Sequence, residues 1–279
     1  MINWITYGLI PVSDYTSPAI FGLAILMWYL VLRKHISIKE NYKLLIKVAA
    51  ASFAGAAITP LIMIIIQGDL IPFFKQTFET IGKVSDCNSL KRLVYIANKG
   101  FSITGGLTIL TIVLFFIVDD AKKLSFGILY PFPLFTAITR INCLLEGCCF
   151  GVRYEGPFAI IFPPGSPVSR FHRRRYGLVS MFERSFPVFP SQIAIILSML
   201  LLFAFLFLMN KFNVKKNIIA GTSLAGYGLF NFIIEIFRQE PRIIGNYLTT
   251  GQIMEMFLFF IGLFIIFKVD EKSVTTEKV

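Results

Sequence analysis

Long apolar segments alternate with short polar ones along the sequence. Seven of them come close to the roughly 20 residues that a transmembrane helix needs. These segments are residues 17–32, 44–66, 103–118, 127–145, 192–209, 218–237 and 249–267. The apolar runs lack the period-two alternation of a transmembrane β-barrel. We therefore expect an all-α integral membrane bundle of about seven transmembrane helices.

Composition supports the same class of protein. Hydrophobic residues make up 56% of the 279 residues, too large a share for one or two soluble domains. We expect a single polytopic domain over residues 1–279. Outside the helices, residues 67–102 predict an extracytoplasmic amphipathic arm, and residues 268–279 predict a cytoplasmic tail. The proline-rich residues 151–191 predict an extracytoplasmic loop region, with at most one short helix near residues 170–178.

Basic residues predict the orientation in the membrane. Lysines and arginines follow the first, third, fifth and seventh apolar segments, which places those loops in the cytoplasm and the N-terminus outside. One outer loop breaks this bias, because it contains Arg153, Arg170, Arg173, Arg174, Arg175 and Arg184. Together with a net charge of +11, this loop predicts contact with anionic lipid. Nucleic acid is not expected as a partner, since the chain has no soluble basic domain.

The four cysteines are Cys87, Cys143, Cys148 and Cys149. They do not predict a disulfide framework, because Cys143 falls within an apolar segment and Cys148 and Cys149 are adjacent. No histidine stands at a ligand spacing from them, so we expect no metal site and no cofactor. We interpret them as small buried hydrophobic side chains, and a Cys148–Cys149 bond stays open as the alternative.

Ionisable groups inside a transmembrane helix cost about 2.5 to 3.5 kcal/mol each on insertion scales, so each one is a functional hypothesis. Tyr227, Asn231, Glu235 and Arg238 follow one another at intervals of four, four and three residues, which places them on one face of the sixth helix. This polar stripe predicts a site that faces protein or water. The alternative is a structural Glu235–Arg238 pair with Arg238 reaching the headgroups.

Arg140 lies near the outer end of the fourth apolar segment and requires an anionic partner. Phosphate fits, because a guanidinium offers a planar fork of donors and remains charged at physiological pH. A salt bridge to Glu235 is the structural alternative.

Five segments carry a resemblance to a known family, and their order and spacing agree with it. They are residues 140–151, 162–167, 187–192, 227–238 and 248–252. Together they resemble the bacterial prolipoprotein diacylglyceryl transferase family, at the level of a divergent member.

The resemblance implies a multi-pass enzyme of the bacterial cytoplasmic membrane. Such an enzyme moves the diacylglyceryl group of phosphatidylglycerol to the lipobox cysteine of a prolipoprotein, and its partners are this lipid and the prolipoprotein signal peptide. It implies catalytic roles for Arg140, Glu235 and Tyr227. The expected substrate-binding residues are Arg238, Asn231, Gly105, Gly106, Glu146, Ser191, Gln192, Arg173 and Arg174.

The sequence departs from the family pattern at five positions. Thr104 and Phe189 stand where the family has histidines, Asn231 stands where it has an arginine, and Cys143 and Cys148 displace an asparagine and a glutamate. These changes remove one phosphate-binding guanidinium and the most obvious general base. They leave open an inactive or repurposed member that binds anionic phospholipid or a lipidated partner. A transporter is disfavoured, because no inverted repeat is visible.

Overall fold

The computed structural model describes residues 16–35, 42–43, 45–47, 50, 122–177, 184–239, 242–244 and 247–276. These residues belong to two compact units. The first comprises Met1–Ile36, Phe126–Pro241 and Glu255–Val279, and the second comprises Ser37–Ser125 and Arg242–Met254. The first unit contains the polar stripe and Arg140.

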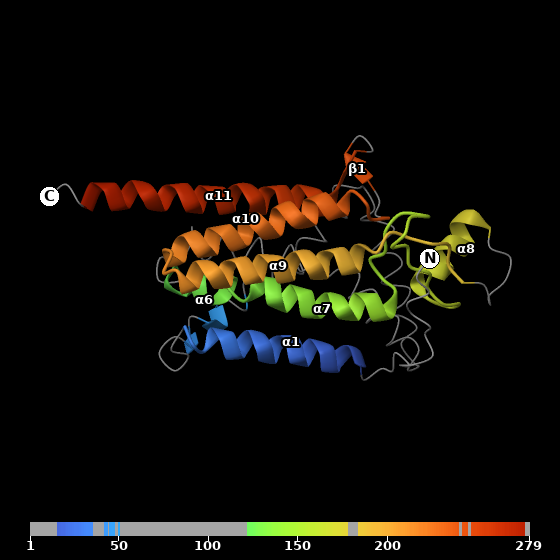
Figure 1. Ribbon diagram of the computed structural model, residues 1–279, viewed down its shortest axis with the longest axis horizontal. Helices are drawn as coiled ribbons and strands as arrows, with labels where there is room; N and C mark the ends of the chain where they lie inside the picture. The colour runs from blue at the N-terminus through green and yellow to red at the C-terminus, as the bar shows by residue number, and fades with distance from the viewer. Residues whose placement is uncertain are drawn as a thin grey trace, which may run out of the picture. The chain divides into compact units, whose positions relative to one another are not determined.

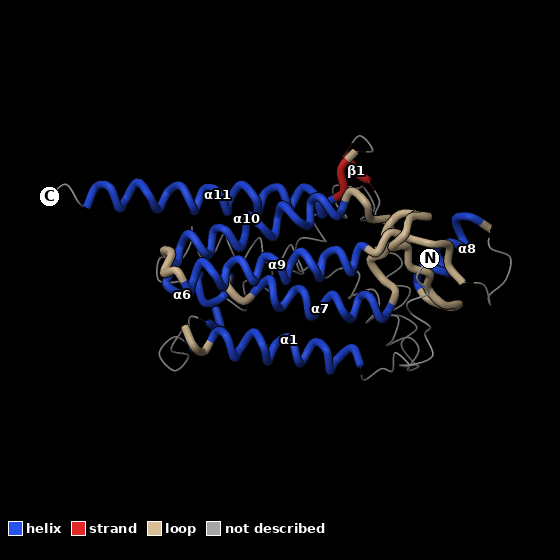
Figure 2. Tube along the Cα trace, viewed as in Figure 1, coloured by secondary structure: helices blue, strands red, loops and turns tan. Residues whose placement is uncertain are grey.

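Helices dominate the described residues (Figures 1 and 2). They are α1 (Thr16–Leu32), α6 (Lys122–Leu129), α7 (Phe132–Glu146), α9 (Ser191–Lys211), α10 (Lys216–Glu235) and α11 (Thr250–Thr276). Three stretches, Phe126–Glu146, Ser191–Lys211 and Lys216–Glu235, are long and apolar enough to cross a membrane, and Ala19–Leu32 and Gly251–Phe267 are shorter apolar helices. The all-helical membrane class is confirmed in this coarser form. The predicted segments 44–66 and 103–118 and the arm at 67–102 lie largely or wholly outside the described residues, so the total of seven stays a prediction.

The predicted fourth segment forms two helices instead of one, because of its prolines. α6 ends at Leu129, and α7 begins after Pro131 with a second proline in its first turn. Proline lacks an N–H and is tolerated mainly in the first turn of a helix, so carbonyls before it lose their partners. Neighbouring helices satisfy them: Ser223 Oγ donates to Leu129 O at 2.7 Å, and Trp28 Nε1 donates to Ile128 O at 3.2 Å.

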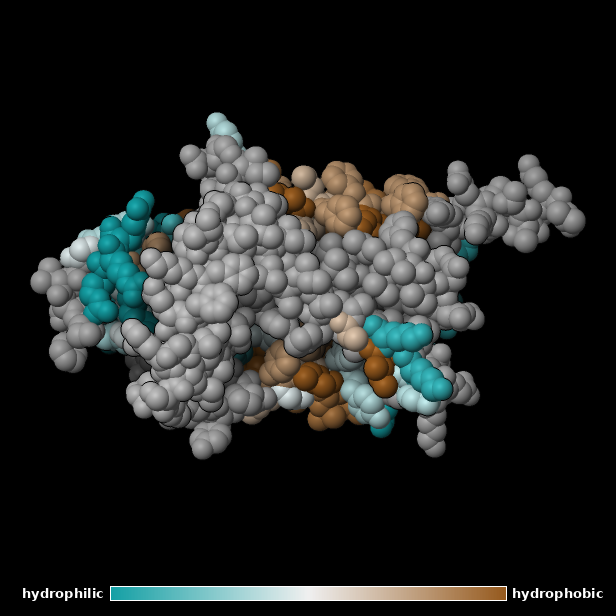
Figure 3. Space-filling view, turned by 180° about the vertical axis from the view of Figure 1, so that it is seen from behind, coloured by the Kyte–Doolittle hydropathy of each residue, from teal (hydrophilic) through white to brown (hydrophobic). Residues whose placement is uncertain are grey.

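Within the first unit, α7 packs against α1 and α9, and α10 packs against α9 (Figure 1). Buried apolar side chains of α9 and α10 contribute to this core, among them Met199, Leu206 and Leu224. The opposite sides of the helices expose large apolar side chains, including Leu201, Phe205, Phe257 and Phe260. Figure 3 shows such apolar surface along the helices. An exposed apolar belt of this kind suits a lipid solvent.

Glycines bring α10 and α11 into backbone contact. A Cβ on Gly221 would lie 2.8 Å from Gly262 O, and a Cβ on Gly228 would lie 2.8 Å from Phe259 N. Small residues at such an interface let membrane helices approach closely enough for extensive van der Waals contact. This contact places the part of α11 that follows Glu255 directly beside the polar stripe of α10.

The loop region after α7 has its own small core, made of Ile160, Phe162, Val168 and Val188. It contains α8 (Pro167–Tyr176), which confirms the predicted short helix and begins three residues earlier than residue 170. Its first turn explains the shift. Ser166 Oγ accepts a hydrogen bond from Ser169 N at 3.1 Å, and Pro167 fits the first helical position.

A short antiparallel pair, β1 (Arg242–Ile244) and β2 (Leu248–Thr249), precedes α11 in the second unit. This strand pair was not predicted from the sequence. Thr249 and Gln252 then cap α11 reciprocally: Gln252 N donates to Thr249 Oγ1 at 3.1 Å, and Thr249 N donates to Gln252 Oε1 at 3.0 Å.

Candidate active site

The chain reverses at the end of α7. Gly147 adopts a left-handed conformation with φ of 66°, and Cys148 N donates to Cys143 O at 3.1 Å, which closes the helix. Cys149 also has a positive φ of 54°. Residues other than glycine rarely adopt this conformation, and they keep it only where the surrounding structure requires it. The reversal folds Cys148 and Cys149 back over the last turn of α7.

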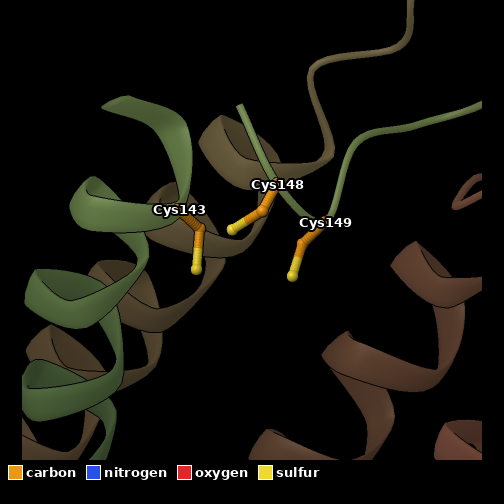
Figure 4. Close-up of side chains that lie close together, drawn as sticks. All are labelled: Cys143, Cys148 and Cys149. Carbon is orange, nitrogen blue, oxygen red and sulfur yellow. The ribbon is translucent and has the colours of Figure 1, made fainter. Parts of the chain in front are cut away.

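This reversal brings three thiols together. The Sγ atoms of Cys143, Cys148 and Cys149 all lie within 4.8 Å of one another, and each side chain is half-buried as a free thiol (Figure 4). The sequence predicted no disulfide framework, and these three thiols are free; their close approach was not predicted, because the spacing of the sequence does not reveal the turn. Hydrogen bonds from Cys143 and Cys148 lower the pKa of Cys149 well below its usual value.

The first turn of α9 holds the cysteine loop in place. Ser191 Oγ donates to Cys149 O at 2.8 Å, and Gln192 Nε2 donates to Cys148 O at 2.7 Å. Both side chains are fully buried. In the structure their side-chain donors bind the loop, and their predicted role in substrate binding stays a prediction. Glu146 also contacts the loop, because its Oε2 accepts a hydrogen bond from Cys148 Sγ at 3.9 Å.

Backbone pairing joins the loop to the end of α10. Val152 N donates to Phe237 O at 2.8 Å, Gln239 N donates to Phe150 O at 3.1 Å, and Gly151 pairs with Arg238. Arg238 in turn forms a largely buried ion pair with Glu235. From the sequence, this Glu235–Arg238 pair was the structural alternative to a functional site. It orients the guanidinium and balances its charge.

The end of α7 and the polar stripe share one electrostatic neighbourhood. Arg140 is half-buried and interacts electrostatically with Tyr227 and with all three thiols of the loop. Cys149 interacts with both Arg140 and Arg238. Two guanidiniums and three thiols are therefore gathered at one end of the helices.

Three members of the stripe, Tyr227, Asn231 and Glu235, are deeply buried. The Tyr227 ring packs edge-on against Phe132, with centroids 5.3 Å apart. The amide of Asn231 donates to Tyr227 O at 2.9 Å, so it satisfies a carbonyl of its own helix. Asn231 was predicted to bind substrate, and one of its two amide N–H donors is hydrogen-bonded to the backbone of its own helix.

Glu255 on α11 was not among the residues predicted from the sequence. Its side chain is 4% exposed and interacts electrostatically with Glu235, Arg238 and Arg140. Within the described part of the chain, its Oε2 has no hydrogen-bond partner. An acidic residue inside the last apolar segment was a readable signal, because buried carboxylates in membrane helices are costly.

The remaining predicted residues lie elsewhere. Arg173 and Arg174 are in the last turn of α8, where positive charge complements the helix dipole, and Arg174 is exposed. Gly105 and Gly106 are outside the described residues. His172, also on α8, is buried among aromatic rings, and its Nδ1 accepts a hydrogen bond from Phe186 N at 3.1 Å. Burial lowers its pKa, which keeps it neutral.

Comparison with known proteins identifies the family of the chain. The model of one family, described as prolipoprotein diacylglyceryl transferase, matches residues 4–268. The chain belongs to this family. The resemblance inferred from the motifs is therefore confirmed.

Curated relatives in the prolipoprotein diacylglyceryl transferase family are distant. A phosphatidylglycerol–prolipoprotein diacylglyceryl transferase of Shewanella sp. (strain ANA-3) is 28% identical over 188 residues, which cover 65% of this chain and 64% of the relative. The protein of that name from Vibrio campbellii is 27% identical over 192 residues, 64% of this chain and 62% of the relative. A second form from Clostridium perfringens is 28% identical over 141 residues, half of each chain. The matched segments thus span less than two thirds of these relatives.

Proposed function

We propose that this protein transfers the diacylglyceryl group of phosphatidylglycerol to a cysteine thiol of a prolipoprotein, at the outer face of a bacterial cytoplasmic membrane. The family match over residues 4–268 carries the proposal, and the relatives' names state this donor and acceptor. The site supports it, because two arginines lie at one end of a bundle whose outer faces are apolar.

In this reaction the acceptor sulfur attacks the glyceryl carbon that is bonded to the phosphate oxygen. A carbon–sulfur bond forms, the carbon–oxygen bond breaks, and glycerol phosphate leaves with the bonding electrons. Negative charge grows on the phosphate in the transition state, so fixed guanidiniums there accelerate the reaction. Arg140 suits the phosphate clamp, and Glu235 holds Arg238 in position as the second cation.

The polar stripe offers no evident general base to activate the acceptor thiol. A thiol must lose its proton to become a strong nucleophile. Glu235 forms an ion pair with Arg238, so its carboxylate already has a cationic partner inside the protein. Tyr227 is fully buried beside Arg140 and helps to position the guanidinium.

The test is direct. Purified protein is incubated with headgroup-labelled phosphatidylglycerol and a lipobox peptide, and labelled glycerol phosphate is measured together with the mass of the peptide. We expect release that depends on the peptide, and none with a peptide that has serine in place of cysteine. Lipid binding without release would contradict the proposal and would favour the inactive, lipid-binding member.

A further inference from the structure

We propose that Cys143, Cys148 and Cys149 bind one zinc ion through their three thiolates, and that the fourth coordination position takes the thiol of the acceptor. The metal-binding part stands on the geometry of this chain alone. The acceptor part rests on the proposed function.

The sulfur geometry suits a single tetrahedral ion. Zinc–sulfur bonds of about 2.3 Å place tetrahedral sulfur ligands roughly 3.8 Å apart. The three Sγ atoms here lie within 4.8 Å of one another, so small side-chain rotations bring them to bonding distance. Figure 4 shows the Cys148 side chain directed toward Cys143, with Cys149 facing the same space.

The backbone prepares this arrangement in advance. Gly147 and Cys149 both have positive φ, and hydrogen bonds from Ser191 and Gln192 fix the carbonyls of Cys148 and Cys149. These two donors bind backbone carbonyls, whereas the Cys148 thiol donates to Glu146 Oε2 at 3.9 Å. A loop that is held in a rare conformation by buried partners is typical of a binding site.

The surrounding charges match the ion. Three thiolates and one zinc ion carry a net charge of −1, and Arg140, which interacts with all three cysteines, compensates it. A disulfide would use two of the three sulfurs and leave the third without a function. Among the described residues, this cluster offers three metal-binding side chains. Catalytic zinc sites typically have three protein ligands and one open coordination position.

An open position on zinc supplies the activation that the polar stripe lacks. The acceptor thiol binds the metal as thiolate and releases its proton to water. Its sulfur then attacks the glyceryl carbon, the carbon–oxygen bond breaks, and the leaving phosphate takes the electron pair beside Arg140. Zinc keeps its +2 charge throughout, so no oxidant or reductant is required.

The first experiment measures metal without reference to activity. Full-length protein, purified in detergent without chelators, is analysed for metals by mass spectrometry, together with Cys148→Ser and the control Cys87→Ser. We expect roughly one zinc per chain in the wild type and the control, and at least about tenfold weaker binding in Cys148→Ser. Replacement of zinc by cobalt should produce thiolate-to-metal charge-transfer absorption that this variant lacks.

Three results would overturn the metal site. They are wild-type protein that binds no zinc when it is supplied, equal zinc in Cys148→Ser, and a thiol titration that reveals a disulfide within the cluster. Copper in place of zinc would also overturn the proposal, because three thiolates saturate trigonal copper and leave no position for an acceptor. Melting curves of Cys148→Ser and chelation of the wild type separate loss of metal from loss of fold.

The second experiment tests the acceptor. A lipobox peptide should shift the cobalt spectrum, whereas the same peptide with serine in place of cysteine should not. Chelation should lower transfer at least about tenfold, and added zinc should restore it. Full transfer by metal-free protein would refute the catalytic role. Zinc binding with no transfer under any condition would instead refute the proposed function and leave the metal site intact.

Discussion

Replacement of Arg140 by lysine separates a shaped phosphate site from a general basic surface. Lysine keeps the charge but loses the planar fork, so it cannot form two parallel bonds to one phosphate. Arg140 is half-buried beside Tyr227 and the cysteine loop. Water has limited access there, so it cannot fully replace a hydrogen bond that is lost to phosphate. Arg174 is the matched comparison, because it is exposed on α8.

The magnitude follows from one lost charge-assisted hydrogen bond. Such a bond contributes about 1.5 to 3 kcal/mol, so Arg140→Lys should lower the efficiency of lipid turnover about ten- to hundredfold. A headgroup contact at Arg174 contributes about 1 kcal/mol and is screened by salt, so lysine should replace it with little loss.

The assay measures kcat/KM for glycerol phosphate release at two salt concentrations, with phosphatidylglycerol in mixed micelles. The loss in Arg140→Lys should persist at high salt, whereas the smaller loss in Arg174→Lys should vanish. Equal, small and salt-sensitive effects at both positions would show that Arg140 is not the clamp.

Three further predictions concern stability in detergent. Gly228→Val should destabilise the contact between α10 and α11 by about 1 to 3 kcal/mol, because the new side chain would overlap the backbone of α11. In the control Gly22→Val, an added Cβ meets no atom within 4 Å, so no such overlap should lower the melting temperature. Ser166→Ala should cost about 1 kcal/mol through loss of the α8 cap, with transfer retained. Burial lowers the pKa of His172, so the unfolded chain takes up the proton first and stability should fall as pH decreases below 6.5. His172→Asn keeps an acceptor for Phe186 N and should show a shallower pH dependence.

Each of these predictions has a contradicting result. Equal melting temperatures for Gly228→Val and wild type would show that the two helices separate freely. An unchanged melting temperature in Ser166→Ala would place the stability of α8 in its core contacts. An identical pH slope for His172→Asn and wild type would assign the pH dependence to other groups.

Sequence alone determined the membrane class and most of the described helices. A bilayer demands about 20 apolar residues in a row, so the signal lies in one continuous segment and needs no partner. The polar stripe from Tyr227 to Arg238 was readable for the same reason, because helical periodicity alone places these residues on one face. The family motifs were equally local, and the match over residues 4–268 agrees with them.

Only the tertiary structure decided what the polar residues contact. The thiol cluster depends on a reversal at Gly147, and the cysteine loop depends on buried donors from Ser191 and Gln192, more than 40 residues away. Glu255 meets the arginines only because glycines let α10 and α11 approach closely. Such contacts join segments far apart in the chain, and their geometry depends on packing and hydrogen bonding that no single segment encodes.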